Sequence, residues 1–205
     1  MIHCQLMPPC PQGRTNPIWP LKYALILLVL VLVSCAGAET AYRRNMFEGV
    51  GYLRAGDYGP AKASFMKAAE VARTPASFAF AATASYKQGD LDGALRYVQE
   101  AERTNGRSFA ALRVAGYRAL VLMKSGKTEE GLTALKAYID LYEHLLPMTN
   151  IQDVGRMYRE KHVDLPVLEK LIDEQVNLYE SEIKQLHETG TGYLGNRYEQ
   201  QFLGP

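Results

Sequence analysis

Hydrophobic and polar positions divide the 205-residue chain into three zones. An apolar run of about a dozen residues begins at Tyr23, about the length of a signal-peptide core. From residue 41, helix-compatible segments alternate with short breaks at glycine, proline or asparagine. After residue 189, glycine and aromatic residues dominate. The pattern predicts an all-α protein with helices at 41–54, 58–72, 75–88, 91–104, 108–124, 128–145, near 150–160, and from 166 to 186.

The apolar run ends in a recognisable motif. It is shorter than the roughly 20 residues of a permanent transmembrane helix, and Leu32-Val33-Ser34-Cys35 follows. This motif resembles the lipobox of bacterial lipoproteins, in which a signal peptidase cuts before the cysteine that carries the lipid. The resemblance implies a signal peptide at 1–35, lipidation of Cys35 and a short linker at 36–40. Ala36 and Gly37, directly after Cys35, are not acidic, which in that family favours the outer membrane facing the periplasm. The alternative is an uncleaved signal anchor with an incidental cysteine.

An internal repeat follows. Turn glycines stand at 56, 89 and 126, separated by 33 and 37 residues, and small residues at 61, 94 and 131 keep the same steps. This spacing resembles the tetratricopeptide repeat (TPR), a helix–turn–helix unit of about 34 residues. The resemblance covers residues 41–146 and implies a solenoid of about three repeats. An ordinary helical bundle is the alternative. Small residues would allow close helix crossing, and large ones would fill the gaps beside them: Tyr52, Phe65, Val98 and Leu135.

The C-terminal part is expected to close the stack. Residues 147–189 are predicted as capping helices, and a coiled-coil partner interface is the alternative. The long helix carries one apolar stripe: Leu168, Leu171, Ile172, Gln175, Tyr179, Ile183 and Leu186. Residues 190–205 form a Gly/aromatic tail, in which Tyr193, Tyr198 and Phe202 are expected to fold back onto the stack or to dock into a partner.

Composition and motifs exclude several functions. The net charge of +1 argues against a nucleic-acid partner. No cysteine lies beyond Cys35, so the body has no internal disulfide. His144, His162 and His187 are too far apart for metal-ligand spacing, and nucleophile-elbow, Walker and dinucleotide motifs are absent. We expect no metal, no cofactor and no catalytic residue, hence no enzyme, although a hydrolase stays the outside alternative.

The TPR resemblance also implies a binding groove, lined by the first helix of each repeat. The residues placed there are Arg43, Met46, Val50, Arg54, Thr83, Tyr86, Lys87, Arg113, Leu120, Met123 and Lys124. A basic residue recurs before each turn glycine, so the groove would have a basic rim and would suit an acidic, apolar segment of a partner. Alternatively, these cations merely balance helix C-termini.

These features together predict a scaffold rather than a catalyst. We expect a membrane-anchored lipoprotein that binds envelope proteins and assists assembly of a complex of the pilus or secretion type. A structural subunit of a surface complex and an adaptor that recruits a cell-wall enzyme are the alternatives.

Overall fold

The computed structural model describes residues 18–104, 109–145 and 151–189, with side chains for 37–104, 109–143 and 151–185. Eight helices and no strand occur among these residues, which confirms the all-α prediction. In chain order the helices are α1 (Ile18–Ala55), α2 (Tyr58–Val71), α3 (Pro75–Gln88), α4 (Leu91–Arg103), α5 (Ala111–Lys124), α6 (Thr128–Leu145), α7 (Ile151–Glu160) and α8 (Leu165–Thr189).

Helix α1 begins much earlier than predicted. Residues 36–40, expected as a linker, are helical, because alanines flank Gly37 and no proline interrupts the segment. The chain divides into two compact units, Met1–Glu39 and Thr40–Pro205, and all packing described below belongs to the second. Among the residues described, no helix is both long and apolar enough to cross a membrane.

Glycine ends the first helix of each pair, as predicted. Gly56, Gly89 and Gly126 have φ angles of 84°, 85° and 77°, a left-handed conformation that glycine adopts without steric cost. The helix starts also follow the sequence. Pro75 occupies the first turn of α3, where the Thr74 side chain accepts a hydrogen bond from the Ser77 backbone N–H.

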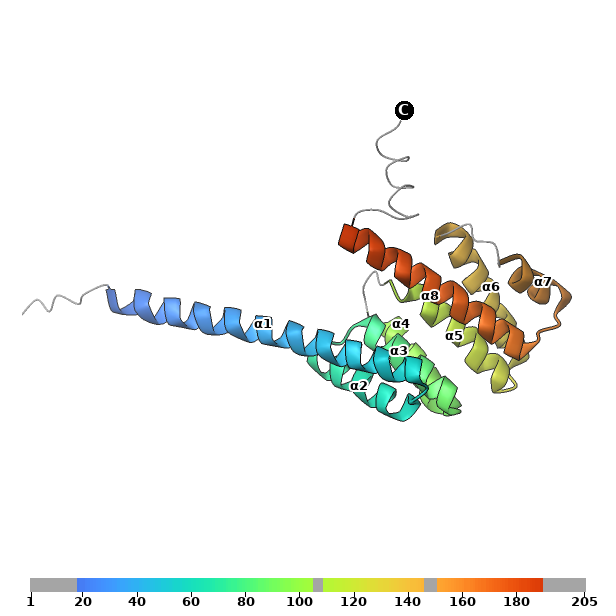
Figure 1. Ribbon diagram of the computed structural model, residues 1–205, viewed down its shortest axis with the longest axis horizontal. Helices are drawn as coiled ribbons and strands as arrows, with labels where there is room; N and C mark the ends of the chain where they lie inside the picture. Colours follow the sequence, from blue (N-terminus) through green and yellow to red (C-terminus); the bar gives the residue numbers. More distant parts are fainter. Residues whose placement is uncertain (1–17, 105–108, 146–150, 190–205) are drawn as a thin grey trace, which may run out of the picture. The chain divides into compact units, whose positions relative to one another are not determined.

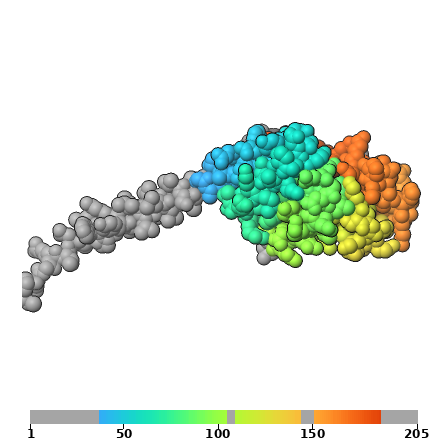
Figure 2. All heavy atoms as spheres, turned by 90° about the horizontal axis from the view of Figure 1, so that it is seen from below, coloured from blue at the N-terminus to red at the C-terminus, as the bar shows by residue number. Residues whose placement is uncertain are grey.

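The helices pack consecutively as a helical solenoid. Contacts run from α2 to α3, α3 to α4, α4 to α5, α5 to α6 and α6 to α7 (Figure 1). In the space-filling view the colours accordingly pass in chain order across the surface (Figure 2). Helix α8 breaks this order, because it packs on α5 instead of continuing the series (Figure 1). The glycine turns join α1 to α2, α3 to α4 and α5 to α6, and these successive helices are called pairs below.

Small and large residues divide the core as expected, with one exception. Ala61 and Ala94 are fully buried, as are the gap-filling Phe65, Val98 and Leu135. Gly49 lies so close to the Phe65 ring that an added Cβ would be 2.5 Å from it.

Tyr52, predicted to fill a gap in the core, is 42% exposed, so that prediction is wrong. Its equivalents one and two pairs later, Ser85 and Leu122, are buried. No described helix pair precedes α1–α2, and the side chain therefore has no earlier pair to pack against.

Candidate functional site: the inner face of α3 and α5

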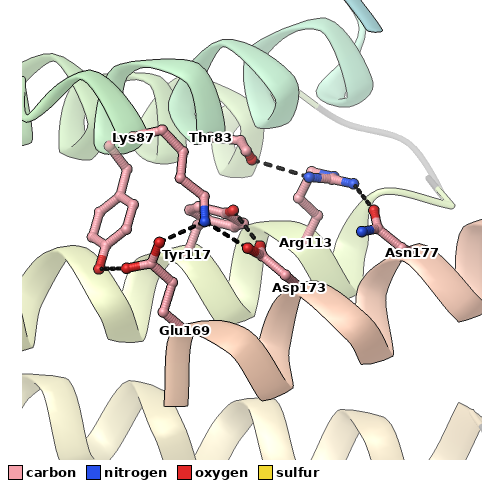
Figure 3. Close-up of polar contacts among 8 residues, drawn as sticks. Thr83, Lys87, Arg113, Tyr117, Glu169, Asp173 and Asn177 are labelled. Carbon is pink, nitrogen blue, oxygen red and sulfur yellow. Dashed lines mark hydrogen bonds and ion pairs between the residues drawn. The ribbon is translucent and has the colours of Figure 1, made fainter. Parts of the chain in front are cut away.

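The inner face, formed by the first helix of each pair, is occupied at α3 and α5 by the chain's own helix α8 (Figure 3). Hydrogen bonds join α8 to side chains of α3 and α5. The two residues of each bond are separated by between 56 and 86 positions in the sequence. The expected cap therefore differs from the observed one: α7 packs on α6, while α8 lies along the surface predicted to be an open groove.

Lys87 is the centre of the first cluster of polar contacts. Its Nζ lies 2.5 Å from Oε1 of Glu169 and 2.6 Å from Oδ2 of Asp173. The Tyr86 hydroxyl donates to the other Glu169 oxygen at 2.9 Å, and the Tyr117 hydroxyl donates to Asp173 at 2.5 Å. Three inner-face side chains thus make four hydrogen bonds to two carboxylates of α8 (Figure 3).

The pKa shifts agree with this pairing. Burial opposes the charged form of Lys87, but hydrogen bonds to Asp173 and Glu169 leave its pKa raised. Burial likewise opposes ionisation of Glu169, and bonds from Lys87 and Tyr86 still leave its pKa lowered. Burial, followed by the charge of Asp173, raises the pKa of Tyr117 well above its usual value. At neutral pH Glu169 and Lys87 are therefore charged and the two tyrosines remain donors.

Arg113 forms the second cluster of polar contacts. Its guanidinium donates to both carboxylate oxygens of Glu180 at 2.8 Å, a bidentate pair. It also donates at 3.2 Å to Asn177 of α8 and to Thr83 of α3, and it stacks 4.2 Å above the Phe80 ring. The residue is only 3% exposed. Burial opposes its charge, yet the bonds to Glu180 leave its pKa raised.

The apolar side of α8 is packed as tightly as a core helix. Leu168, Ile172 and Val176 are fully buried. An added Cβ on Gly116 would lie 2.6 Å from Cγ2 of Ile172, so only glycine allows this approach. On the α6 side the Tyr138 hydroxyl lies 2.5 Å from Oε1 of Gln175. Helix α8 is therefore an integral part of the fold.

A hollow of about 640 Å³ opens where α8 begins. Lys124 lies beside it, with its ammonium 4.4 Å from the centre of the Tyr86 ring. Three lysines and three carboxylates line the hollow, so it has no net charge and is not an anion site: Lys87, Lys124, Lys170, Glu169, Asp173 and Glu174.

The predicted groove residues fall into four groups. The structure brings together Thr83, Tyr86, Lys87 and Arg113 beneath α8. A partner therefore cannot reach these four residues, contrary to the prediction of an open groove. Leu120 (0% exposed) and Met123 (8%) belong to the core and do not line an open groove. Lys124 is exposed at the hollow, and the remaining four residues lie on α1: Arg43, Met46, Val50 and Arg54.

Two further predictions lie outside the described side chains. Cys35 falls within helical backbone, but its side chain is not among those described. The tail residues Tyr193, Tyr198 and Phe202 also lie outside the described residues. Among the residues described, no group of three or more histidine, cysteine or acidic side chains could hold a metal ion.

Sequence reasoning missed the α8 side of the site and Tyr117. The missed α8 residues are Glu169, Asp173, Asn177 and Glu180. A signal was present, because residues 165–189 contain six acidic and two basic residues beside an apolar stripe. This is the chemistry that the groove was predicted to bind.

No protein-family model matches this chain, and no curated protein matches its sequence.

Proposed function

We propose that this protein is a non-enzymatic scaffold lipoprotein that binds other proteins through the inner face of a TPR-like solenoid. It assists assembly of an envelope complex of the pilus or secretion type, anchored by lipid on Cys35 in the outer membrane and facing the periplasm. The partner is an envelope protein, and neither nucleic acid nor a cofactor takes part.

One observation carries the proposal. The inner faces of α3 and α5 bind an acidic amphipathic helix, α8, through aromatic and cationic side chains. Helix-in-groove recognition uses this combination of an apolar stripe and flanking charges. A solenoid that holds one helix in this way has the surface chemistry to hold another, and the exposed members of the pattern, Arg54 and Lys124, are available for contact.

Capture from detergent-solubilised envelope tests the scaffold role. The intact protein is compared with Arg54→Glu/Lys124→Glu, which alters neither Lys87 nor Arg113, and unchanged circular dichroism is required of the variant. Lys67→Glu/Lys127→Glu is the control with the same charge change at other exposed positions. We expect one envelope protein to be retained by the intact protein and the control, and lost by the first variant. Capture of nothing specific would contradict the scaffold role, and equal capture by all three would exclude the inner face.

The anchor is tested separately. The mature N-terminus should begin at Cys35 with an added acyl mass, and Cys35→Ser should abolish both the mass and the membrane association. A mature protein that keeps residues 1–34 would exclude the lipoprotein assignment.

A further inference from the structure

The inner face of α1 has the same pattern of residues as the surface that holds α8. Arg54 and Leu53 precede Lys87 and Tyr86 by 33 residues, the step between their turn glycines. Phe47 precedes Phe80 by the same 33 residues, and Phe80 precedes Tyr117 by 37. The side chains that meet α8 on α3 and α5 thus have counterparts on α1.

The α1 counterparts differ in exposure. Phe47 is 81% exposed, whereas Phe80 is 7% and Tyr117 is 1% exposed. Met46, Val50 and Leu53 are half-buried against the cluster around Phe65 and Phe80. Phe47 and these three half-buried apolar side chains together form an apolar patch on α1, and contiguous apolar patches often mark interaction sites.

The charge of this surface restricts its occupant. Residues 40–55 contain three arginines (Arg43, Arg44 and Arg54) and one acidic residue, Glu48. All three arginines are exposed. Helix α8, which occupies the equivalent surface further along, has six acidic and two basic residues. Electrostatic complementarity therefore favours a second helix of the same sign as α8.

We propose that the α1 surface, Arg43 to Arg54, binds an acidic amphipathic helix supplied by a partner protein, and that α8 is the template for its chemistry. The partner helix carries carboxylates spaced like Glu169, Asp173 and Glu180, four and then seven residues apart, beside an apolar stripe. Phe47 contacts the apolar stripe, and the arginines pair with the carboxylates. This inference rests on the proposed scaffold function and names the partner's class and the surface that it uses.

A synthetic peptide of residues 165–189 with a fluorescent label serves as the acidic helix. Its binding to the full-length protein in mild detergent is measured by fluorescence anisotropy. We expect saturable binding that weakens at least about tenfold with Arg43→Glu/Arg54→Glu or with Phe47→Ala. Lys67→Glu/Lys127→Glu should bind like the unaltered protein. A peptide with all three template carboxylates changed to amides should also bind at least about tenfold more weakly.

Three results would overturn the proposal. The first is the absence of saturable binding by a protein whose circular dichroism is unchanged. The second is binding that survives Arg43→Glu/Arg54→Glu, which would place the peptide elsewhere, for example in exchange with α8. The third is at least about tenfold tighter binding by Tyr193→Ser/Tyr198→Ser/Phe202→Ser, which would identify the chain's own tail as the occupant. Envelope capture is independent of this peptide, so failure here leaves the scaffold role to its own test.

Discussion

Replacing Arg113 with methionine tests whether the buried ion pair holds α8 in place. Methionine keeps much of the apolar volume above Phe80 but removes all four hydrogen bonds of the guanidinium. The side chain of Glu180 is only 14% exposed and would lose its cation. Leaving one partner of a buried pair uncompensated costs about 3–5 kcal/mol of unfolding free energy. For a domain of this size we expect the melting temperature to fall by roughly 6–20 °C.

The second step of the test removes the stranded charge as well. Arg113→Met/Glu180→Leu leaves no unpaired carboxylate, and replacing both members of a buried pair by apolar residues is often close to neutral. We therefore expect the double variant to be at least about 2 kcal/mol more stable than Arg113→Met alone. Arg118→Met on the same helix is the control. Its partner is Glu102 and its side chain is 48% exposed, so its loss should cost no more than about 1 kcal/mol.

Urea unfolding at neutral pH, followed by far-UV circular dichroism, measures these free energies. A cost below about 1 kcal/mol for Arg113→Met would refute the assignment of Arg113 to a buried, coupled site. A double variant no more stable than the single one would show that the cost does not come from the unpaired Glu180.

Three further perturbations test the turn, the helix contact and the ion pairs. Gly89→Ala should lower the free energy of unfolding by about 1–2 kcal/mol because the φ of Gly89 is positive. Gly59, in the first turn of α2, has room for a methyl group, so Gly59→Ala should leave the free energy of unfolding unchanged in the same urea assay. Gly116→Ala should cost about 1–3 kcal/mol by pushing on Ile172, and Ile172→Ala should cost less in that background than alone; equal costs would exclude the contact. The pKa of Glu169 is lowered in the fold, so its contribution is complete above the unfolded value of about 4.3 and is lost as the pH falls through the folded value. The protection factors of the α8 amides, which compare each exchange rate with the intrinsic rate at the same pH, should therefore fall below about pH 4.3, and unchanged α8 protection in acid would contradict this.

The helices were predictable because their boundaries are local. Gly56, Gly89 and Gly126 end three helices at the positions that backbone conformation requires, and Pro75 starts another. The sequence predicted that α5 begins at 108, whereas it begins at Ala111. Residues around Asn105 favour turns, and they do not define the first residue of the next helix.

The location of α8 was not predictable in the same way. Amphipathic periodicity shows that Leu168 and Ile172 need a covering surface, but it does not say which surface covers them. The acidic residues of α8 and the cations Lys87 and Arg113 are far apart in the sequence. Only an assumed long-range ion pairing would have connected them. Val176, fully buried, was missed because the predicted stripe passed through Gln175.

The closure by α8 changes how this stack should come apart. In a simple solenoid each pair contacts only its neighbours, so pairs fray from the ends one after another. Here Lys87 and Asp173, 86 residues apart, are joined, and the bonds of α8 reach α3, α5 and α6. These helices should open together as one cooperative block, while α1 and α2 open at lower free energy. The surface proposed for a partner thus belongs to the part of the stack that is freest to adjust, and a bound helix there would extend the cooperative block to the first pair.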